Sequence, residues 1–338
     1  TIKDSEDQDN VEAISNAEKH NEGNESVNGV DHIHSRKDFQ PYFVNADHSV
    51  NKIHVSKVPE ICRTEPCQLG VDEAGRGPVL GPMVYGISYA PLSNEKLLVD
   101  LGCADSKSLT EDQRDSIFDG ICENRDKMGW AVEVISPNII ANSMYRRSKV
   151  SLNEVSMNSA INLIKISIEA GVNLAEVYVD TVGKPEKYQA KLKEIFPDLK
   201  IVVAKKADST YPIVSAASIC AKVSRDAALR AWQFREGENE SEYGSGYPND
   251  PATKKWLTAN VDQVFGFPQI VRFSWSTAEK IIESNALGVE WEEIIDEEKT
   301  AGSQNISKFF SKVNSRTEVR RDKHKFFADR CLTNVTSL

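Results

Sequence analysis

The chain has 338 residues, of which 40% are hydrophobic, and its formal net charge is −10. This length allows one large domain or two medium ones with a sizeable core. The sequence contains no run of about 18 apolar residues and no apolar signal-peptide core, so we expect a soluble, intracellular protein. The acids are in excess mainly in residues 1–58 and 236–338, and the nearly neutral segment between them leaves room for a basic groove.

The histidines and cysteines limit the possible chemistry. Five of the six histidines lie in the first 54 residues and the sixth is His324, so residues 59–290 contain none. The six cysteines form no C-x-x-C pair, which argues against a zinc cage and a disulfide framework. Ser-His-Asp catalysis, Cys-His catalysis and histidine-ligated zinc are therefore excluded from residues 59–290. Any chemistry there depends on carboxylates, which favour Mg²⁺ or Mn²⁺.

Residues 1–58 are rich in polar residues and show no sustained periodicity, which predicts a disordered acidic tail. Beyond them, short β-branched runs predict strands over residues 68–72, 79–89, 130–135, 176–180 and 200–204. Helical patterns follow over residues 112–123, 152–170, 185–195 and 215–230. The first three strands would form an antiparallel meander, and the last two, separated by a helix, a parallel pair.

The predicted fold class is therefore α/β, with a mixed sheet flanked by helices. We expect residues 59–235 to form a catalytic domain and residues 236–288 a helical, substrate-binding extension. Residues 289–338 split sharply by charge, which is typical of a tail that docks on partners.

Acids recur where predicted strands end or helices begin. Asp72 and Glu73 follow the first strand, Asp180 ends the fourth, and Asp208 precedes the 215–230 helix. Such ends converge in an α/β sheet, so these acids can meet. Two divalent ions about 4 Å apart need several carboxylates, since each takes about six oxygen ligands. A single acid at such a place is more often a helix cap or an ion-pair partner, but the combination indicates a metal-dependent site.

Two further segments indicate contact with a substrate. Gly75, Arg76 and Gly77 follow the first acids, and glycines let a backbone approach a substrate closely. Backbone amides there can reach a sugar hydroxyl while Arg76 neutralises phosphate. The Pro- and Gly-dense segment 243–251 either is a rigid polar loop or presents Tyr247 as a stacking platform.

In combination these segments resemble the type 2 ribonuclease H family, and the pattern is that of the catalytic chain of its eukaryotic heterotrimers. The resemblance covers about residues 60–285. It rests on Asp72-Glu73-Ala74-Gly75-Arg76-Gly77-Pro78, Asp105-Ser106-Lys107, Val179-Asp180-Thr181, Lys206-Ala207-Asp208, Ser215-Ala216-Ala217-Ser218, Gly246-Tyr247-Pro248 and Arg272-Phe273-Ser274-Trp275.

The resemblance implies a ribonuclease H-like fold and endonucleolytic cleavage of RNA in RNA/DNA hybrids. It also implies cleavage at single ribonucleotides embedded in duplex DNA, leaving 5′-phosphate and 3′-hydroxyl ends. By position, the catalytic and metal-binding acids would be Asp72, Glu73, Asp180 and Asp208, holding two Mg²⁺ or Mn²⁺ ions. The substrate contacts would be Gly75, Arg76 and Gly77 at the 2′-hydroxyl, Lys107 at a phosphate, and Tyr247 at the deoxyribose after the ribonucleotide.

The resemblance further implies two accessory subunits, a nuclear location and a role in DNA replication and repair. Residues 303–310 resemble a sliding-clamp-binding motif, although Ser303 stands where glutamine is expected, and docking on the accessory subunits is the preferred interpretation. Two alternatives remain open: a non-catalytic hybrid-binding protein, and another ribonuclease H-like nuclease that acts on DNA.

Overall fold

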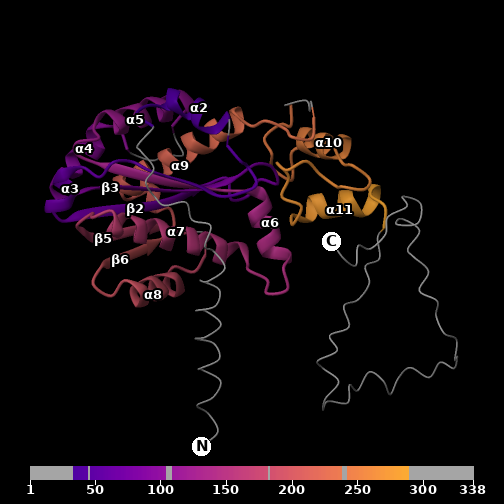
Figure 1. The fold of residues 1–338 in the computed structure, drawn as a ribbon. Coiled ribbons are helices and arrows are strands. Elements are labelled where there is room, and N and C mark those ends of the chain that lie inside the picture. The colour runs from indigo at the N-terminus through magenta and orange to yellow at the C-terminus, as the bar shows by residue number, and fades with distance from the viewer. Residues whose placement is uncertain (1–32, 45, 104–108, 182, 238–241, 289–338) are drawn as a thin grey trace, which may run out of the picture. The chain divides into compact units, whose positions relative to one another are not determined.

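A six-stranded mixed sheet with helices on both faces organises the chain (Figure 1). The computed structural model describes residues 33–44, 46–103, 109–181, 183–237 and 242–288, all within the unit Thr1–Gly288. The strands are β1 (Lys52–Val55), β2 (Cys67–Ala74), β3 (Met83–Pro91), β4 (Gly129–Ile135), β5 (Leu174–Asp180) and β6 (Lys200–Ala204). Their order in the sheet is β1-β4-β3-β2-β5-β6. The predicted α/β class is confirmed.

The pairing of the strands follows the sequence pattern. β2, β3 and β4 form the predicted antiparallel meander, and β5 and β6 the predicted parallel pair. β2 also pairs with β5 in parallel, so β2 joins the two halves of the sheet. The second strand begins at Met83 instead of residue 79, because Gly81 with φ of 80° and Pro82 interrupt it.

Helices cover both faces of the sheet in Figure 1. They are α2 (Phe39–Val44), α3 (Glu60–Thr64), α4 (Glu95–Asp100), α5 (Glu111–Glu123), α6 (Pro137–Tyr145), α7 (Leu152–Glu169), α8 (Pro185–Ile195), α9 (Pro212–Arg230), α10 (Pro251–Ala259) and α11 (Ser276–Asn285). Single 3₁₀ turns are η2 (Arg36–Asp38), η3 (Leu92–Asn94) and η4 (Ala207–Ser209). None of these helices is both long and apolar enough to cross a membrane.

Helix α9 lies directly on β2 and β3 because two strand glycines make room for its backbone. A Cβ atom at Gly70 would stand 2.3 Å from the carbonyl oxygen of Ile213, and one at Gly86 would stand 2.6 Å from that of Ala217. Any side chain at these two positions would push the helix off the sheet. The close approach brings Ser218 of α9 to the side chain of Asp72 in β2.

The core divides into two clusters, one on each face of the sheet. One contains buried residues of α2, α4, α5 and α9, and the other contains buried residues of α3, α6, α7 and α8. A smaller third cluster joins Val79 and Leu80 to apolar residues of α10, α11 and the segment between them. The segment 79–80, which would have continued β3, therefore packs against residues beyond 250.

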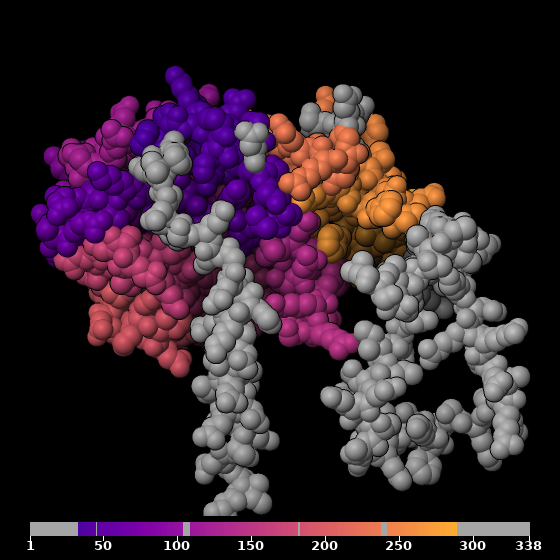
Figure 2. Space-filling model, viewed as in Figure 1, coloured from indigo at the N-terminus to yellow at the C-terminus, as the bar shows by residue number. Residues whose placement is uncertain are grey.

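The prediction that residues 1–58 are disordered is wrong for residues 33–44 and 46–58. β1 pairs with β4, and the side chains of Phe39 and Phe43 are each 1% exposed. In Figure 2 this indigo segment forms part of the surface of the folded body. The composition is polar, but Phe39 and Phe43 stand four residues apart and share one helix face. Averaging hydrophobicity over the segment hides such a short, focused anchor.

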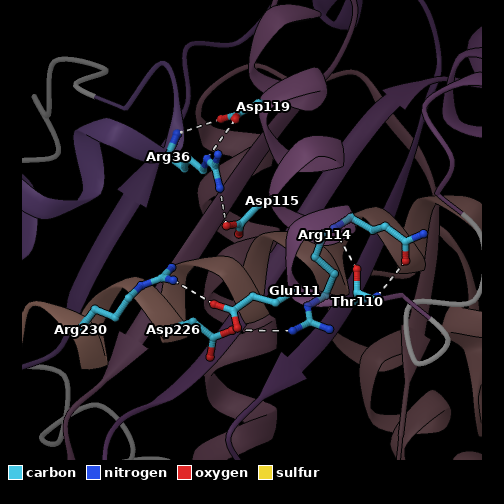
Figure 3. A network of polar contacts seen from close by, with 9 residues as sticks. Arg36, Thr110, Glu111, Arg114, Asp115, Asp119, Asp226 and Arg230 are labelled. Carbon is cyan, nitrogen blue, oxygen red and sulfur yellow. Dashed lines mark hydrogen bonds and ion pairs between the residues drawn. The ribbon is translucent and has the colours of Figure 1, made fainter. Parts of the chain in front are cut away.

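Ion pairs hold the same segment to α5. Arg36 contacts Asp115 at 2.5 Å and Asp119 at 3.2 Å (Figure 3). The same figure shows Arg230 of α9 on Glu111 of α5, at 2.9 Å. Charged groups at the rim therefore tie η2, α5 and α9 around the apolar contacts of Phe39.

We expect Phe39→Ala to lower the free energy of unfolding by about 3–5 kcal/mol, because it leaves a cavity among Phe43, Phe118 and Trp130. Phe265→Ala is the matched control, since Phe265 is 89% exposed. Urea unfolding measures both variants. Equal, small effects of the two substitutions would show that the N-terminal segment does not contribute to the core.

Candidate active site

The parallel register of β2 and β5 places two of the predicted acids side by side. Val71 pairs with Val179, so Asp72 and Asp180 are the next residues on adjacent strands. Both lie at the carboxyl ends of their strands, where sites assemble in α/β sheets. The charge of Asp180 acts on the pKa of Asp72, which confirms that the two carboxylates are near each other.

Asp208 belongs to the same end of the sheet through η4. After β6 the chain turns at Lys206, whose φ of 55° is left-handed, and enters η4. The backbone N–H of Ala207 donates to Oδ1 of Asp180 at 2.7 Å. This bond ties η4, and with it the buried Asp208 at 2% exposure, to the end of β5.

Asp72 is a buried carboxylate under electrostatic stress. Its side chain is 6% exposed, and burial, followed by the charges of Glu73 and Asp180, raises its pKa well above the ordinary value. Two donors oppose this shift: the hydroxyl of Ser218, and the backbone N–H of Glu73, 2.7 Å from Oδ1. Those bonds fix the orientation of the carboxylate without neutralising the cluster.

Glu73 points to the opposite face of β2, because side chains alternate along a strand. It lies across from Tyr85 of β3 and lines a cavity of about 370 Å³ together with Asp180 and Arg76. Burial, and then the charge of Glu73, raises the pKa of Tyr85 and of Tyr188. Asp180 therefore stands between Asp72 on one face and Glu73 at the cavity.

The chemistry of these side chains fits a hard divalent cation. Every predicted ligand is a carboxylate, the donor type that suits Mg²⁺ and Mn²⁺, and the repulsion on Asp72 is what such a cation relieves. The geometry is less converged than the sequence predicts. Within the residues that the structure describes, no three His, Cys, Asp or Glu side chains are placed to hold one ion.

The loop of Gly75, Arg76 and Gly77 is held from behind by two residues near α11. Arg272 donates from Nη2 to the carbonyl oxygen of Gly75 at 2.7 Å and from Nη1 to that of Arg76 at 3.1 Å. Trp275 donates from Nε1 to the carbonyl of Gly77 at 3.1 Å. Three successive carbonyls of the loop thus face the same pair of side chains.

This anchoring sets the direction of the loop amides. In a planar trans peptide the C=O of one residue and the N–H of the next point in opposite directions. The N–H groups of Arg76 and Gly77 therefore point away from Arg272, and Pro78 has no N–H to direct. The loop presents two backbone donors on the side opposite its anchor.

Arg272 is buried without a carboxylate partner. It is 0% exposed, its Nε donates to the carbonyl of Gly81 at 2.8 Å, and its guanidinium lies 5.0 Å from the ring centroid of Trp275. Burial, and then the charge of Arg225, lowers its pKa well below the ordinary value. Carbonyl dipoles and one aromatic face thus replace a counter-ion, an arrangement that suits the planar fork of arginine.

The loop glycines also meet the side chains around them. A Cβ at Gly75, where φ is 75°, would stand 2.0 Å from Nε of Arg225, and one at Gly77 would stand 3.1 Å from the ring of Tyr247. The predicted stacking residue Tyr247, 52% exposed, therefore lies beside the predicted loop. The guanidinium of Arg76 donates to Asn153 and Ser156 of α7.

The structure thus brings together six of the predicted residues from distant segments around the strand ends and the loop: Asp72, Glu73, Gly75, Arg76, Gly77 and Asp180. Asp208 and Tyr247 join them through η4 and the ring contact with Gly77. Lys107 and Asp105 lie outside the described residues. Sequence reasoning assigned no role to Arg272, Trp275 or Arg225. An arginine inside the apolar run 270–273 was the available signal.

We expect Arg272→Ala to destabilise the fold by at least about 3 kcal/mol, because it leaves several buried carbonyls without a donor. Arg272→Lys should recover little, since one ammonium cannot reach all three carbonyls. Arg235→Ala is the control, because that side chain is 62% exposed. Thermal unfolding compares the three, and a lysine variant as stable as the parent would refute the carbonyl-fork account.

Three comparisons with known proteins bear on this site. The family model described as ribonuclease HII matches residues 69–278. The A subunit of ribonuclease H2 from Rattus norvegicus is 52% identical over 285 residues, covering 84% of this chain and 94% of the relative. Its counterpart in Homo sapiens is 51% identical over 286 residues with the same coverage, and that in Arabidopsis thaliana 49% over 254 residues, covering 75% and 84%.

Solved structures agree with the sequence relatives. Ribonuclease H2 from Pyrococcus horikoshii matches with a TM-score of 0.55 and 35% identity, covering 64% of this chain and 98% of the other. The ribonuclease HII of Archaeoglobus fulgidus, solved as a complex with PCNA, matches with a TM-score of 0.53 and 32% identity, covering 63% and 96%. The ribonuclease H-like fold implied by the sequence resemblance is confirmed.

Proposed function

Since this chain belongs to the ribonuclease HII family and is an endoribonuclease acting on RNA/DNA hybrids, we propose that Asp72, Glu73, Asp180 and Asp208 form its catalytic centre. The observation that carries the proposal is the raised pKa of buried Asp72, caused by burial and by the charges of Glu73 and Asp180. Structural carboxylates at strand ends are normally paired with cations or left in solvent. A buried carboxylate opposed by two others indicates a role that requires the repulsion.

The same four residues would hold two Mg²⁺ or Mn²⁺ ions, as their oxygen-only donor set suggests. When bound, such ions supply an activated water and stabilise the leaving oxygen of a phosphodiester. Ser218 and the backbone N–H of Glu73 keep Asp72 oriented, and Ala207 does the same for Asp180. We further propose that cleavage leaves 5′-phosphate and 3′-hydroxyl ends.

We propose that the amides of Arg76 and Gly77 identify the ribonucleotide. Arg272 and Trp275 turn the carbonyls of this loop away, so the two N–H groups face outward as fixed donors. The 2′-hydroxyl is the one group that distinguishes RNA from DNA at a single sugar, and it can accept such donors. The glycines let the sugar come close to the backbone.

Tyr247 would then test the next sugar. Its ring is half exposed and lies against Gly77, so a nucleotide read by the loop has its neighbour at the ring. Stacking there would favour a deoxyribose after the ribonucleotide and would support cleavage at single ribonucleotides embedded in duplex DNA. Lys107 remains a proposed phosphate contact outside the described residues.

Partners and location are proposed from the relatives. Those relatives are named as one lettered subunit of ribonuclease H2, which indicates accessory subunits for this chain as well, and the archaeal complex with PCNA supports a sliding-clamp contact. Residues 303–310, which resemble the clamp motif, lie outside the described residues. A nuclear role in DNA replication and repair fits removal of ribonucleotides from DNA.

Asp72→Asn should lower the cleavage rate at an embedded ribonucleotide by at least about a hundredfold in Mg²⁺, because the cluster loses a buried anionic ligand. Asp198→Asn, an exposed acid after α8, is the control with unchanged cleavage. The assay uses a duplex with one ribonucleotide and its all-DNA counterpart. Near-normal cleavage by Asp72→Asn would sink the proposed centre, and equal cleavage of both duplexes would favour a DNA nuclease.

Tyr247→Ala should reduce cleavage at a single embedded ribonucleotide about tenfold more than cleavage within a long RNA run, because only the first substrate depends on the junction sugar. Tyr145→Ala is a matched control, since Tyr145 is 49% exposed and lies on Phe273 instead of the loop. Initial rates on both substrates measure the ratio. An unchanged ratio in Tyr247→Ala would remove the junction role.

A further inference from the structure

We propose that one face of α8, formed by Lys184, Lys187 and Lys191, binds backbone phosphates of the nucleic acid that reaches the carboxylates. This inference rests on the proposed function and extends it to a second contact surface. The name lysine face is used below for these three residues. α8 lies along β6 at the edge of the sheet (Figure 1).

The lysine face follows from helical spacing. At 100° per residue, side chains three, four and seven positions apart fall on one side of a helix. Lys184 is the N-cap of α8, and Lys187 and Lys191 continue the same side over the next two turns. Lys193 stands two residues beyond Lys191 and therefore points about 160° away from it.

This face opens into the cavity of the proposed catalytic centre. Lys184, Lys187 and Lys191 line the same cavity of about 370 Å³ as Glu73 and Asp180, whereas Lys193 does not line it. The cations and the carboxylates therefore share one solvent space. A molecule that reaches Asp180 through this cavity passes the lysine face.

The three lysines have positive charge to spare. In the part of the chain that the structure describes, none of them forms an ion pair within 4.0 Å of an acid. The nearest acid whose pKa responds is Glu154 of α7, and hydrogen bonds from Ser151 lower that pKa before Lys191 does. Glu154 is thus already engaged as half of the capping box of α7.

A phosphodiester strand is the occupant that this charge arrangement fits. The anionic carboxylates of Glu73 and Asp180 repel a phosphate that approaches them, and cations in the same cavity offset that repulsion. The helix rises about 1.5 Å per residue, so Lys184 to Lys191 extends over about 10 Å. One strand of a duplex presents about three phosphates over that axial length.

The test is the salt dependence of binding by the full chain in EDTA, where cleavage does not interfere. The probe is a fluorescent DNA duplex with one ribonucleotide, and its all-DNA counterpart serves as the second probe. Lys184→Ala/Lys187→Ala/Lys191→Ala should weaken binding at least about tenfold at about 0.1 M salt. It should also reduce the slope of log affinity against log salt by about 2 to 3, for both probes equally.

Lys187→Ala and Lys193→Ala form the matched pair, since both residues are exposed lysines on the same helix. Only Lys187→Ala should reduce the slope, by about 1. Wild-type affinity and slope in the triple variant, or an equal loss in Lys193→Ala, would overturn the inference. A wild-type chain that cleaves neither hybrid nor embedded ribonucleotide would instead refute the proposed function, because the binding slopes do not depend on cleavage.

Discussion

The constraint on which this molecule depends is the burial of the Asp72 carboxylate beside two other acids. Its position follows from the parallel pairing of β2 with β5, which sets Asp72 next to Asp180. Glu73 is adjacent in sequence and adds its charge from the other face of the strand. A fold that contains this repulsion must hold the strands and α9 firmly, because the cluster itself works against burial.

The scaffold meets this requirement with close backbone contacts. Gly70 and Gly86 let α9 lie on β2 and β3, which brings Ser218 to Asp72. On the far side of the loop, Arg272 and Trp275 hold three carbonyls and leave the amides of the loop outward. The carboxylates and the amides are therefore fixed by different elements that meet at the end of β2. Hydrolysis and recognition of the sugar can then be separated by substitution.

Much of this arrangement could be predicted from the sequence, because alternation and strand ends are local signals. The helix over residues 185–195 and the strand over 200–204 were predicted with the bounds that the structure has. The N-terminal segment was missed, since its anchor is two phenylalanines in a polar stretch. The role of Arg272 was missed because its partners are backbone carbonyls almost 200 residues away, which no local pattern encodes. The separation of Asp72 and Glu73 onto opposite faces follows from strand periodicity, but the convergence of all four acids depends on tertiary geometry.

The central claim is that the repulsion at Asp72 exists to bind divalent cations. Calorimetric titration of the metal-free chain with Mn²⁺ tests it without reference to activity. The account predicts about two bound ions per wild-type chain, fewer in Asp72→Asn, and a gain in thermal stability only where ions bind. Wild-type chain that binds no Mn²⁺, or an Asp72→Asn variant that binds it as well as wild type, would contradict the account.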